Sequence, residues 1–499
     1  MPVAFTTLPA EIRVPLFYAE IDPSKANSGG RRNRTLVVGP KLAAGTAPAN
    51  VPVLCTSTGQ ANTYAGRGSI LARMVDAYRR NDDFGEMWIL PVSDPGAGVA
   101  ATKTATVTGP ATGAGTVPLY VAGQLVQVGV ASGDTAAQIA TAIATAVQAA
   151  ADLPFTAAAA DEVVTLTCRH KGLIGNDIDV RVAYRGASGG ESLPAGVAIV
   201  IAAGVAGAGA PDLAAGLAAL GDEEYDHIVM PWTDATSLDA FRDEMNDVTG
   251  RWSPLRMIYG HVYTAKVAAH AALVTLGGQR NDPHATIVGM ADTPTPSYEI
   301  AAAFAARAAR SLNNHPSIPL RTLKLTGVLA PPPESRFTIQ ERNILYWGGI
   351  SSTVCVSGDV IIDRAITTFR VNAFNQPDNG MLNVTRMFQI AYTVRYLRQE
   401  AERTMSRAVL ADDGTAFGAG LPIVTPKIIR GGQIAAYGVL IERGIAENME
   451  AFKAHLIVER APDNSERANI LFAPDYVNEL NIVALLLQFR DQYSAAEAA

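Results

Sequence analysis

The chain has 499 residues, of which 48% are hydrophobic and 17% are charged. A single hydrophobic core stops growing at roughly 250 to 300 residues, so this length predicts about three domains, and the apolar content excludes bulk disorder. Forty Lys and Arg against 47 Asp and Glu give a net charge of -7. That charge has the wrong sign for a protein that coats nucleic acid, so no nucleic-acid partner is expected.

Neither a disulfide framework nor a membrane span is expected. Cys55, Cys168 and Cys355 lie far apart, which predicts small core residues in a reducing cytoplasm. The first twenty residues lack the basic and apolar regions of a secretory signal. The longest uncharged run, residues 194–211, is rich in Gly and Ala and too short to span a membrane. We expect a strand followed by a loop there, and no membrane embedding.

A lone strand is predicted near the N-terminus. Its apolar side chains alternate along the sequence, at Ile12, Val14, Leu16 and Tyr18, and a polar stretch follows. The neighbouring sequence offers no second strand, and Pro15 removes one backbone donor. The strand must therefore pair with a sheet edge elsewhere or stay without fixed structure.

From Thr35 the sequence alternates between strand and helix patterns. Strands are predicted at 35–39, 87–92, 226–232, 256–260, 285–290 and 323–329. Helices are predicted at 68–80, 237–248, 264–276 and 297–309, with Ser237 and Ser297 as caps. Repeated strand and helix units predict a mostly parallel sheet that is covered on both faces.

A segment of different composition, residues 94–200, interrupts this alternation. It is rich in Ala, Gly, Thr and Val, and it contains several strand patterns and one amphipathic helix at 135–150, with Asp134 as the expected cap. It is interpreted as an inserted β-rich domain.

The pattern changes again after Pro331. A helix at 338–347, a hairpin and a long helix at 382–410 are expected, with strand material at 426–432 and 456–460. Residues 481–489 are apolar on both faces, which fits a central buried strand.

The predicted architecture is therefore a multi-domain α/β protein with a mostly parallel α/β core and extended terminal arms. Its parts are an N-terminal arm (1–34), a discontinuous α/β domain (35–93 and 201–330), an inserted β-rich domain (94–200) that is expected on the outside, and an α+β C-terminal domain that ends in a strand (331–499).

A search for catalytic chemistry finds no complete constellation. Residues 186–190 match GxSxG, but loop sequence follows where a nucleophile elbow needs a helix. No phosphate-binding loop is present, and the seven histidines form no HExxH motif. Asp177 and Asp179 supply only two oxygen ligands and fit a solvated or salt-bridged strand face. No cofactor or metal is expected.

The long helix carries more basic than acidic residues. Arg386, Arg395, Arg398, Arg403 and Arg407 stand against Glu400 and Glu402. The excess positive charge could face an acidic partner. Alternatively, Arg398 with Glu402 and Glu400 with Arg403 are ordinary surface pairs.

Several long stretches resemble the tail sheath proteins of contractile-tailed bacteriophages, in their Mu-like branch. They lie at 169–182, 281–290, 336–374, 382–399, 452–460 and 472–490. The resemblance implies a non-enzymatic subunit that stacks in six-membered rings around an inner tail tube and contracts to drive that tube through the host envelope. It also implies further copies of the chain, the tail tube protein, and baseplate and tail terminator proteins as partners. The expected location is the virion tail, after assembly in the host bacterial cytoplasm.

In such sheaths the terminal extensions complete a sheet in neighbouring subunits. The resemblance therefore implies one exchanged strand at the N-terminus. Its contact residues would be Ile12, Val14, Leu16, Tyr18 and Ile21. A second exchanged strand is implied near the C-terminus, with Ile482, Ala484, Leu486 and Phe489, although part of 480–489 could be a core strand. We hypothesise that the surface facing the tube includes Arg395, Arg398, Arg403 and Arg407. Two alternatives remain open here: an α/β hydrolase or nucleotide-utilising enzyme, and a small-molecule binding module.

Overall fold

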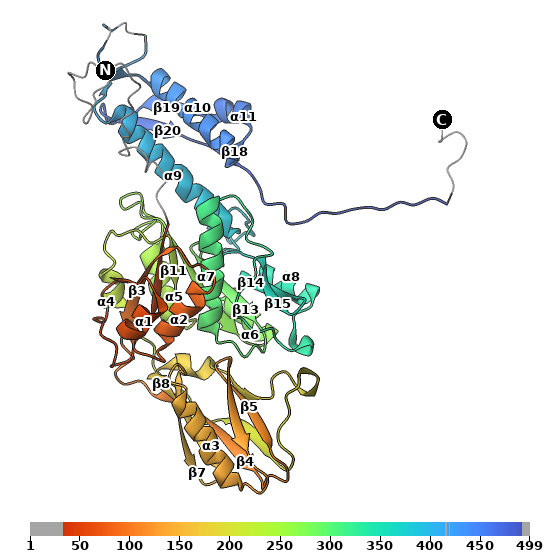
Figure 1. Cartoon of the computed structure of the whole chain (residues 1–499). Coiled ribbons are helices and arrows are strands. Elements are labelled where there is room, and N and C mark those ends of the chain that lie inside the picture. The colour runs from red at the N-terminus through yellow and green to blue at the C-terminus, as the bar shows by residue number, and fades with distance from the viewer. Residues whose placement is uncertain (1–32, 415–416, 419, 492–499) are drawn as a thin grey trace, which may run out of the picture.

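The computed structural model describes residues 33–414, 417–418 and 420–491. Figure 1 shows a central α/β body, with the inserted segment at one end and a smaller, mainly helical part at the other. One long helix joins the central body to this helical part, and the C-terminal segment leaves the body as an extended chain.

The central sheet has eight strands in the order β15-β14-β13-β12-β11-β1-β3-β2. Its parallel strands are β1 (Arg34–Pro40), β3 (Glu86–Val92), β11 (His227–Val229), β12 (His261–Val267), β13 (Ala285–Met290) and β14 (Ile350–Val356). Two antiparallel strands, β2 (Val53–Leu54) and β15 (Asp359–Arg364), form its edges. Every residue of β13 is buried, as expected for a strand covered on both faces. The prediction of a mostly parallel core is confirmed.

Helices cover this sheet, and most of them begin at a side-chain cap. They are α1 (Thr58–Ala65), α2 (Ile70–Arg79), α4 (Ala214–Ala218), α5 (Ala235–Met245), α6 (His270–Gly278), α7 (Ser297–Asn314) and α8 (Ile339–Trp347). Ser69 caps α2, and Thr338 forms a capping box with Glu341 at α8. Two predicted caps were wrong. Asp234 caps α5 in place of Ser237, and Ser297 is already the first residue of α7.

Three central predictions were wrong. Residues 256–260 form no strand, and residues 264–267 belong to β12, so α6 begins only at His270. Residues 323–329 are not a regular strand; Thr322 N–H and Leu325 N–H donate to β15 carbonyls and line that edge of the sheet. The hairpin of β14 and β15 extends the central sheet, although the predicted boundary at 331 assigned it to the C-terminal domain.

The inserted segment is β-rich, as expected. One sheet contains β10 (Ala198–Ala203), β4 (Ala100–Thr108), β8 (Val163–Lys171) and β7 (Phe155–Ala160). A second contains β6 (Gln124–Val130), β5 (Gly115–Val121) and β9 (Val180–Val182). The helix α3 (Ala136–Ala149) buries Ile139, Ile143 and Val147, and its cap is Thr135 rather than the predicted Asp134.

The remaining part is built on two helices, α9 (Val384–Met405) and α10 (Pro426–Glu442), with the short helix α11 (Met449–His455). Three strand pairs accompany them: β16 (Val409–Leu410) with β17 (Ile423–Val424), β18 (Ala446–Glu447) with β21 (Asp475–Tyr476), and β19 (Ile457–Arg460) with β20 (Ala468–Leu471). A separate small core is formed by Tyr437, Leu440, Ile445, Ala446, Phe452 and Leu456.

Residues 426–432, predicted as a strand, form the start of α10. Thr425 caps this helix and Pro426 occupies its first position, which suits a residue without an N–H. The predicted helix at 382–410 ends earlier, at Met405. Among the described residues, none of the helices is long and apolar enough to cross a membrane.

Candidate assembly surfaces

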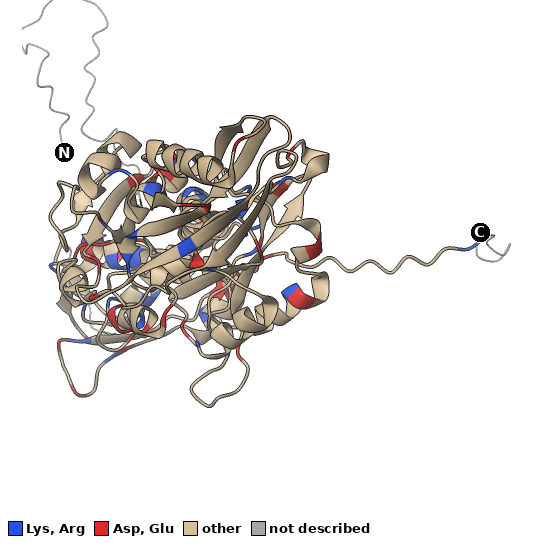
Figure 2. Ribbon diagram, turned by 90° about the horizontal axis from the view of Figure 1, so that it is seen from below, with Lys and Arg blue, Asp and Glu red and all other residues tan. Residues whose placement is uncertain are grey.

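The C-terminal segment is the most exposed apolar part of the described chain. Residues 477–491 contain no strand, and the large apolar side chains of 480–489 lie in the open. Leu486 is 93% exposed and Phe489 is 81% exposed. In Figure 2 this segment leaves the body as a tan ribbon, the colour of residues other than Lys, Arg, Asp and Glu, until a blue stretch near its end. The prediction of a central buried strand here was wrong for the single subunit, because the segment is exposed and forms no strand.

The base of this segment is fixed to the body by polar contacts. Gln389 donates to the Val477 carbonyl at 3.1 Å, and Arg386 donates to the Asn478 side chain at 2.9 Å. Arg321 donates to the Asn481 carbonyl at 2.8 Å. These contacts fix the base of the segment near the first turns of α9, and the extended part begins after residue 481.

The sheet of β19 and β20 has unused edges. Among the described residues each strand pairs only with the other. Val458 packs on the small core, whereas Ile457 and Leu471 are more than half exposed. Backbone groups at such edges can accept a further strand.

Arg395 is held by its own chain. Its guanidinium lies 2.7 Å from Asp226 Oδ1 and 3.2 Å from Glu224 Oε1, and its carbon lies 5.4 Å from the centre of the Tyr259 ring. Two turns earlier on α9, Phe388 stacks on His227 of β11 with ring centres 4.8 Å apart. Arg395 therefore joins α9 to the central sheet.

The other three arginines differ in their surroundings. Arg398 pairs with Glu402 at 2.9 Å, and Arg403 pairs with Glu400 at 2.6 Å, which confirms the expected surface pairs. Arg398 also borders a hollow lined by the acidic residues 222–224. With about 100° between successive helix residues, Arg398 and Arg403 point roughly 140° apart. Arg407 lies beyond the end of α9, exposed and without a recorded ion pair among the described residues. The four arginines thus do not share one face.

The predicted N-terminal contact residues, Ile12, Val14, Leu16, Tyr18 and Ile21, lie outside the described residues. Their role stays a prediction.

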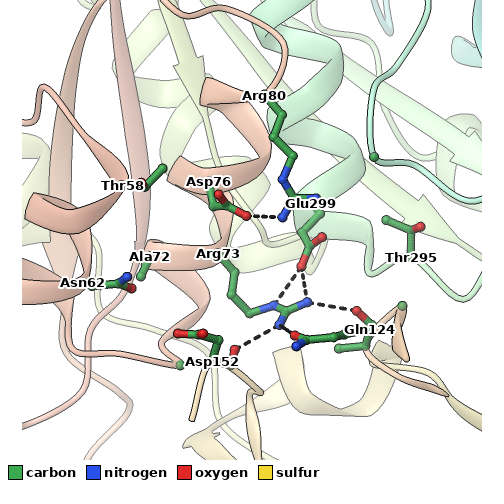
Figure 3. Close-up of a pocket in the computed structure, with 14 residues that line it drawn as sticks. Thr58, Asn62, Ala72, Arg73, Asp76, Arg80, Gln124, Asp152, Thr295 and Glu299 are labelled. Atoms are coloured by element: carbon green, nitrogen blue, oxygen red, sulfur yellow. Dashed lines mark hydrogen bonds and ion pairs between the residues drawn. The ribbon is translucent and has the colours of Figure 1, made fainter. Parts of the chain in front are cut away.

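A buried ion pair lies where the inserted segment meets the central body. Figure 3 shows Arg73 of α2 reaching Glu299 of α7 in a hollow of about 450 Å³. The two side chains are 12% and 8% exposed, and their charged atoms are 2.6 Å apart. Arg73 also donates to the carbonyls of Ala122 and Asp152, both in the inserted segment, at 2.9 Å. One guanidinium thereby ties together three parts of the chain.

A second contact at this junction uses His170 of β8. Its Nε2 accepts a hydrogen bond from the Ile70 N–H at the start of α2, and its Nδ1 bonds to Asp94 at 2.8 Å. Neither Arg73 nor His170 stood out in the sequence. Ordinary helix and strand patterns surround both residues, and their partners lie far away along the chain.

The other residues considered for chemistry have structural roles. Asp177 pairs with Lys266 and Asp179 pairs with Arg181, as expected of salt-bridged carboxylates. Ser188 is exposed on a short 3-10 turn. Across the part of the chain that the structure describes, no group of three or more His, Cys, Asp and Glu side chains is arranged to hold a metal.

Comparison with known proteins decides the family. The phage tail sheath protein central domain matches residues 206–368, and the phage tail sheath protein β-sandwich domain matches residues 96–198. A Mu-like prophage FluMu tail sheath protein from Haemophilus influenzae is 37% identical over 492 residues, which cover 98% of this chain and 100% of the relative. The chain belongs to the phage tail sheath family.

Two solved structures align with most of this sheath protein. The sheath tail protein of Desulfitobacterium hafniense aligns with 93% of this chain and 99% of its own, at 11% identity and a TM-score of 0.47. A chain of the anti-feeding prophage baseplate aligns with 96% of this chain and 99% of its own, at 11% identity and a TM-score of 0.48.

The family settles the main functional prediction. The protein is a structural subunit of a contractile phage tail sheath, located in the virion tail, where it assembles with other tail components. The non-enzymatic prediction is confirmed by this membership, and the hydrolase, nucleotide-enzyme and binding-module alternatives are set aside.

Proposed function

We propose that this sheath protein polymerises as stacked six-membered rings around the tail tube, and that contraction of the stack drives the tube through the host envelope. Its partners are further copies of itself, the tail tube protein, and the baseplate and tail terminator proteins. Assembly takes place in the host bacterial cytoplasm.

The observation that carries this proposal is the exposed C-terminal segment. Its large apolar side chains are not covered by the described residues of their own subunit, and complete burial of each would contribute about 1.5 to 3 kcal/mol. Part of that gain is offset by the cost of association and of ordering the segment. In a stack of rings, a neighbouring subunit can bury the segment of each subunit, and this contact is repeated throughout the assembly.

Exchange of extended segments links the subunits. Residues 480–489 of one subunit, with Ile482, Ala484, Leu486 and Phe489, bind a neighbour, and residues 12–21 do the same from the other end of the chain. The open edges of the β19 and β20 sheet support this role, because an incoming strand would satisfy their free backbone groups. The polar stretch after residue 21 lets the subunits rotate without release of the segment.

The tube contact is weak and salt-sensitive, since the sheath must release its tube on contraction. Of the four arginines first considered, Arg407 is retained as the candidate. Arg395, Arg398 and Arg403 are engaged by carboxylates of their own subunit.

Two truncations test the exchange of segments. Removal of residues 482–499, or separately of residues 1–22, is expected to leave folded monomers that form no sheath in electron micrographs. Circular dichroism of each variant checks the fold. Normal sheaths from either truncated protein would contradict the exchange role of the missing segment.

A further inference from the structure

An apolar groove lies between α9 and α10 in the described chain. It encloses about 410 Å³, and its lining is mainly apolar, including Tyr396, Ala401, Met405, Ile428, Ile429 and Val439. An apolar cavity of about 150 Å³ is enough to hold a benzene molecule. The groove therefore has room for more than one large side chain.

The middle of α10 is built in a way that keeps this groove open. Gly431 and Gly432 are adjacent in the helix, and a Cβ atom added to either would meet no heavy atom within 4 Å. Glycine inside a helix costs about 0.5 to 1 kcal/mol relative to alanine. Packing among the described residues gives no reason for this cost at Gly432, which lines the groove. Open space beside it suits an occupant from outside.

We infer that the α9–α10 groove of one subunit binds apolar side chains from residues 482–489 of a second subunit. This inference rests on the proposed exchange of the C-terminal segment and adds a binding site for it. The groove uses another side of α10 from the small core that holds β19, because the core residues Tyr437 and Leu440 do not line it. It is therefore an acceptor separate from the strand edge.

The chemistry of the segment matches that of the groove. Residues 480–489 carry no charged side chain and are apolar on both faces. A strand edge alone would cover at most one of these faces. The charges at the groove, Glu400 and Arg403, already pair with each other at 2.6 Å. Residues 11–20 fit less well, since they include Glu11, Arg13 and Glu20.

The segment of the same subunit is directed elsewhere. Its base is tied to Arg386 and Gln389, near the start of α9, whereas the groove begins at Tyr396 and extends to Met405. The twelve residues from Gln389 to Ala401 correspond to roughly 18 Å of helix. Figure 1 shows the segment running outward from its own body. A second copy is the occupant that this geometry favours.

Substitution of the two glycines provides a matched test in the full-length chain. Gly432→Leu fills the groove. Gly431→Leu makes the same change at the neighbouring residue, which does not line the groove. Both variants are expected to fold with the parent's circular dichroism spectrum. Gly432→Leu should raise the protein concentration needed for sheath formation at least tenfold, and Gly431→Leu should change it less than twofold. Equal effects of the two variants, or no effect of Gly432→Leu, would overturn the inference.

A cross-linking experiment identifies the occupant. A photo-activated cross-linker is attached to the thiol of a Gln433→Cys, Cys355→Ser variant, because Gln433 lines the groove. After irradiation of assembled sheath, mass spectrometry is expected to find the linker on the peptide that contains residues 480–490. Linkage to residues 1–32, or to a tube protein in co-assembled tails, would refute the assignment. If removal of residues 482–499 abolishes assembly while Gly432→Leu does not, the exchange role stands and only the groove fails.

Discussion

Replacement of Arg395 by glutamine tests whether α9 is rigidly joined to the central sheet. In the parent, the Arg395 guanidinium lies 2.7 Å from Asp226, whose side chain is only 1% exposed. Glutamine keeps part of the stem and removes the charge. The Asp226 carboxylate then loses the Arg395 charge while it remains buried, although it still accepts a hydrogen bond from the Arg34 N–H.

The expected loss follows from the burial of the two partners. An exposed ion pair contributes about 0 to 1 kcal/mol, and removal of one partner of a fully buried pair costs about 3 to 5 kcal/mol. Arg395 is 25% exposed, so water partly compensates for its removal. The free energy of opening the α9 contact should therefore fall by about 2 to 3 kcal/mol.

Arg398→Gln is the matched control, because it makes the same substitution one turn further along α9. Arg398 and Glu402 are 55% and 66% exposed, so this variant should lose less than about 1 kcal/mol. Amide hydrogen exchange over residues 384–395, measured below the concentration of polymerisation, reports the opening directly. If the two variants exchange at the same rate, Arg395 is a surface residue in solution and the reasoning is wrong.

Three further predictions concern the core and the junctions. Burial lowers the pKa of His227 to about 4 and that of His261 well below its usual value, so both side chains bind protons more readily in the unfolded protein. The free energy of unfolding should therefore fall as the pH drops from 6.5 toward 4. In urea titrations, the His227→Gln variant should show a weaker dependence on pH. Glu299→Gln should lower the free energy of unfolding by about 3 kcal/mol in the same titrations, because it leaves the Arg73 charge buried without its carboxylate. Replacement of residues 95–208 by a short Gly/Ser bridge should leave a folded protein that still forms sheaths, as seen by electron microscopy, because the inserted segment is expected on the outside.

Much of the central body could be predicted from the sequence, because its strands are apolar and its helices have strong periodicity. The failure at residues 256–267 has a clear physical cause. Strand β12 contains His261, Thr264 and Lys266, and these polar residues suggested the start of a helix. The structure buries the first two and bonds them over long sequence distances, His261 Nε2 to the Thr286 hydroxyl and the Thr264 hydroxyl to the Trp232 carbonyl. Local pattern cannot reveal such partners.

The error at residues 426–432 was of a different kind. Ile428 and Ile429 are β-branched, and Gly431 and Gly432 disfavour a helix, so local propensity pointed to a strand. The signals of a helix start were present, with Thr425 as a cap and Pro426 at the first position. Those end signals were the better guide, because tertiary packing of the helix outweighs the propensity of single residues.

Residues 480–489 show a feature that the sequence of one chain cannot predict. An apolar pattern on both faces indicates burial, but it does not say whether the cover comes from the same subunit or from another. The same holds for the arginines of α9. Their excess over glutamate was visible in the sequence, whereas the carboxylates that engage Arg395, at Glu224 and Asp226, come from a distant part of the chain.

The contacts within the subunit and the proposed contacts between subunits differ in kind. Inside the subunit, the guanidinium groups of the buried Arg73 and the partly buried Arg395 each bind several partners from different parts of the chain. Such contacts tolerate little displacement, because a buried charge left without its partner is costly. The described surfaces left open are an apolar extended segment, the edges of the β19 and β20 sheet, and an apolar groove. Contacts between the apolar segment and the groove depend weakly on orientation. We therefore expect a change in sheath length to alter the contacts between subunits, while the contacts of Arg73 and Arg395 within each subunit stay the same.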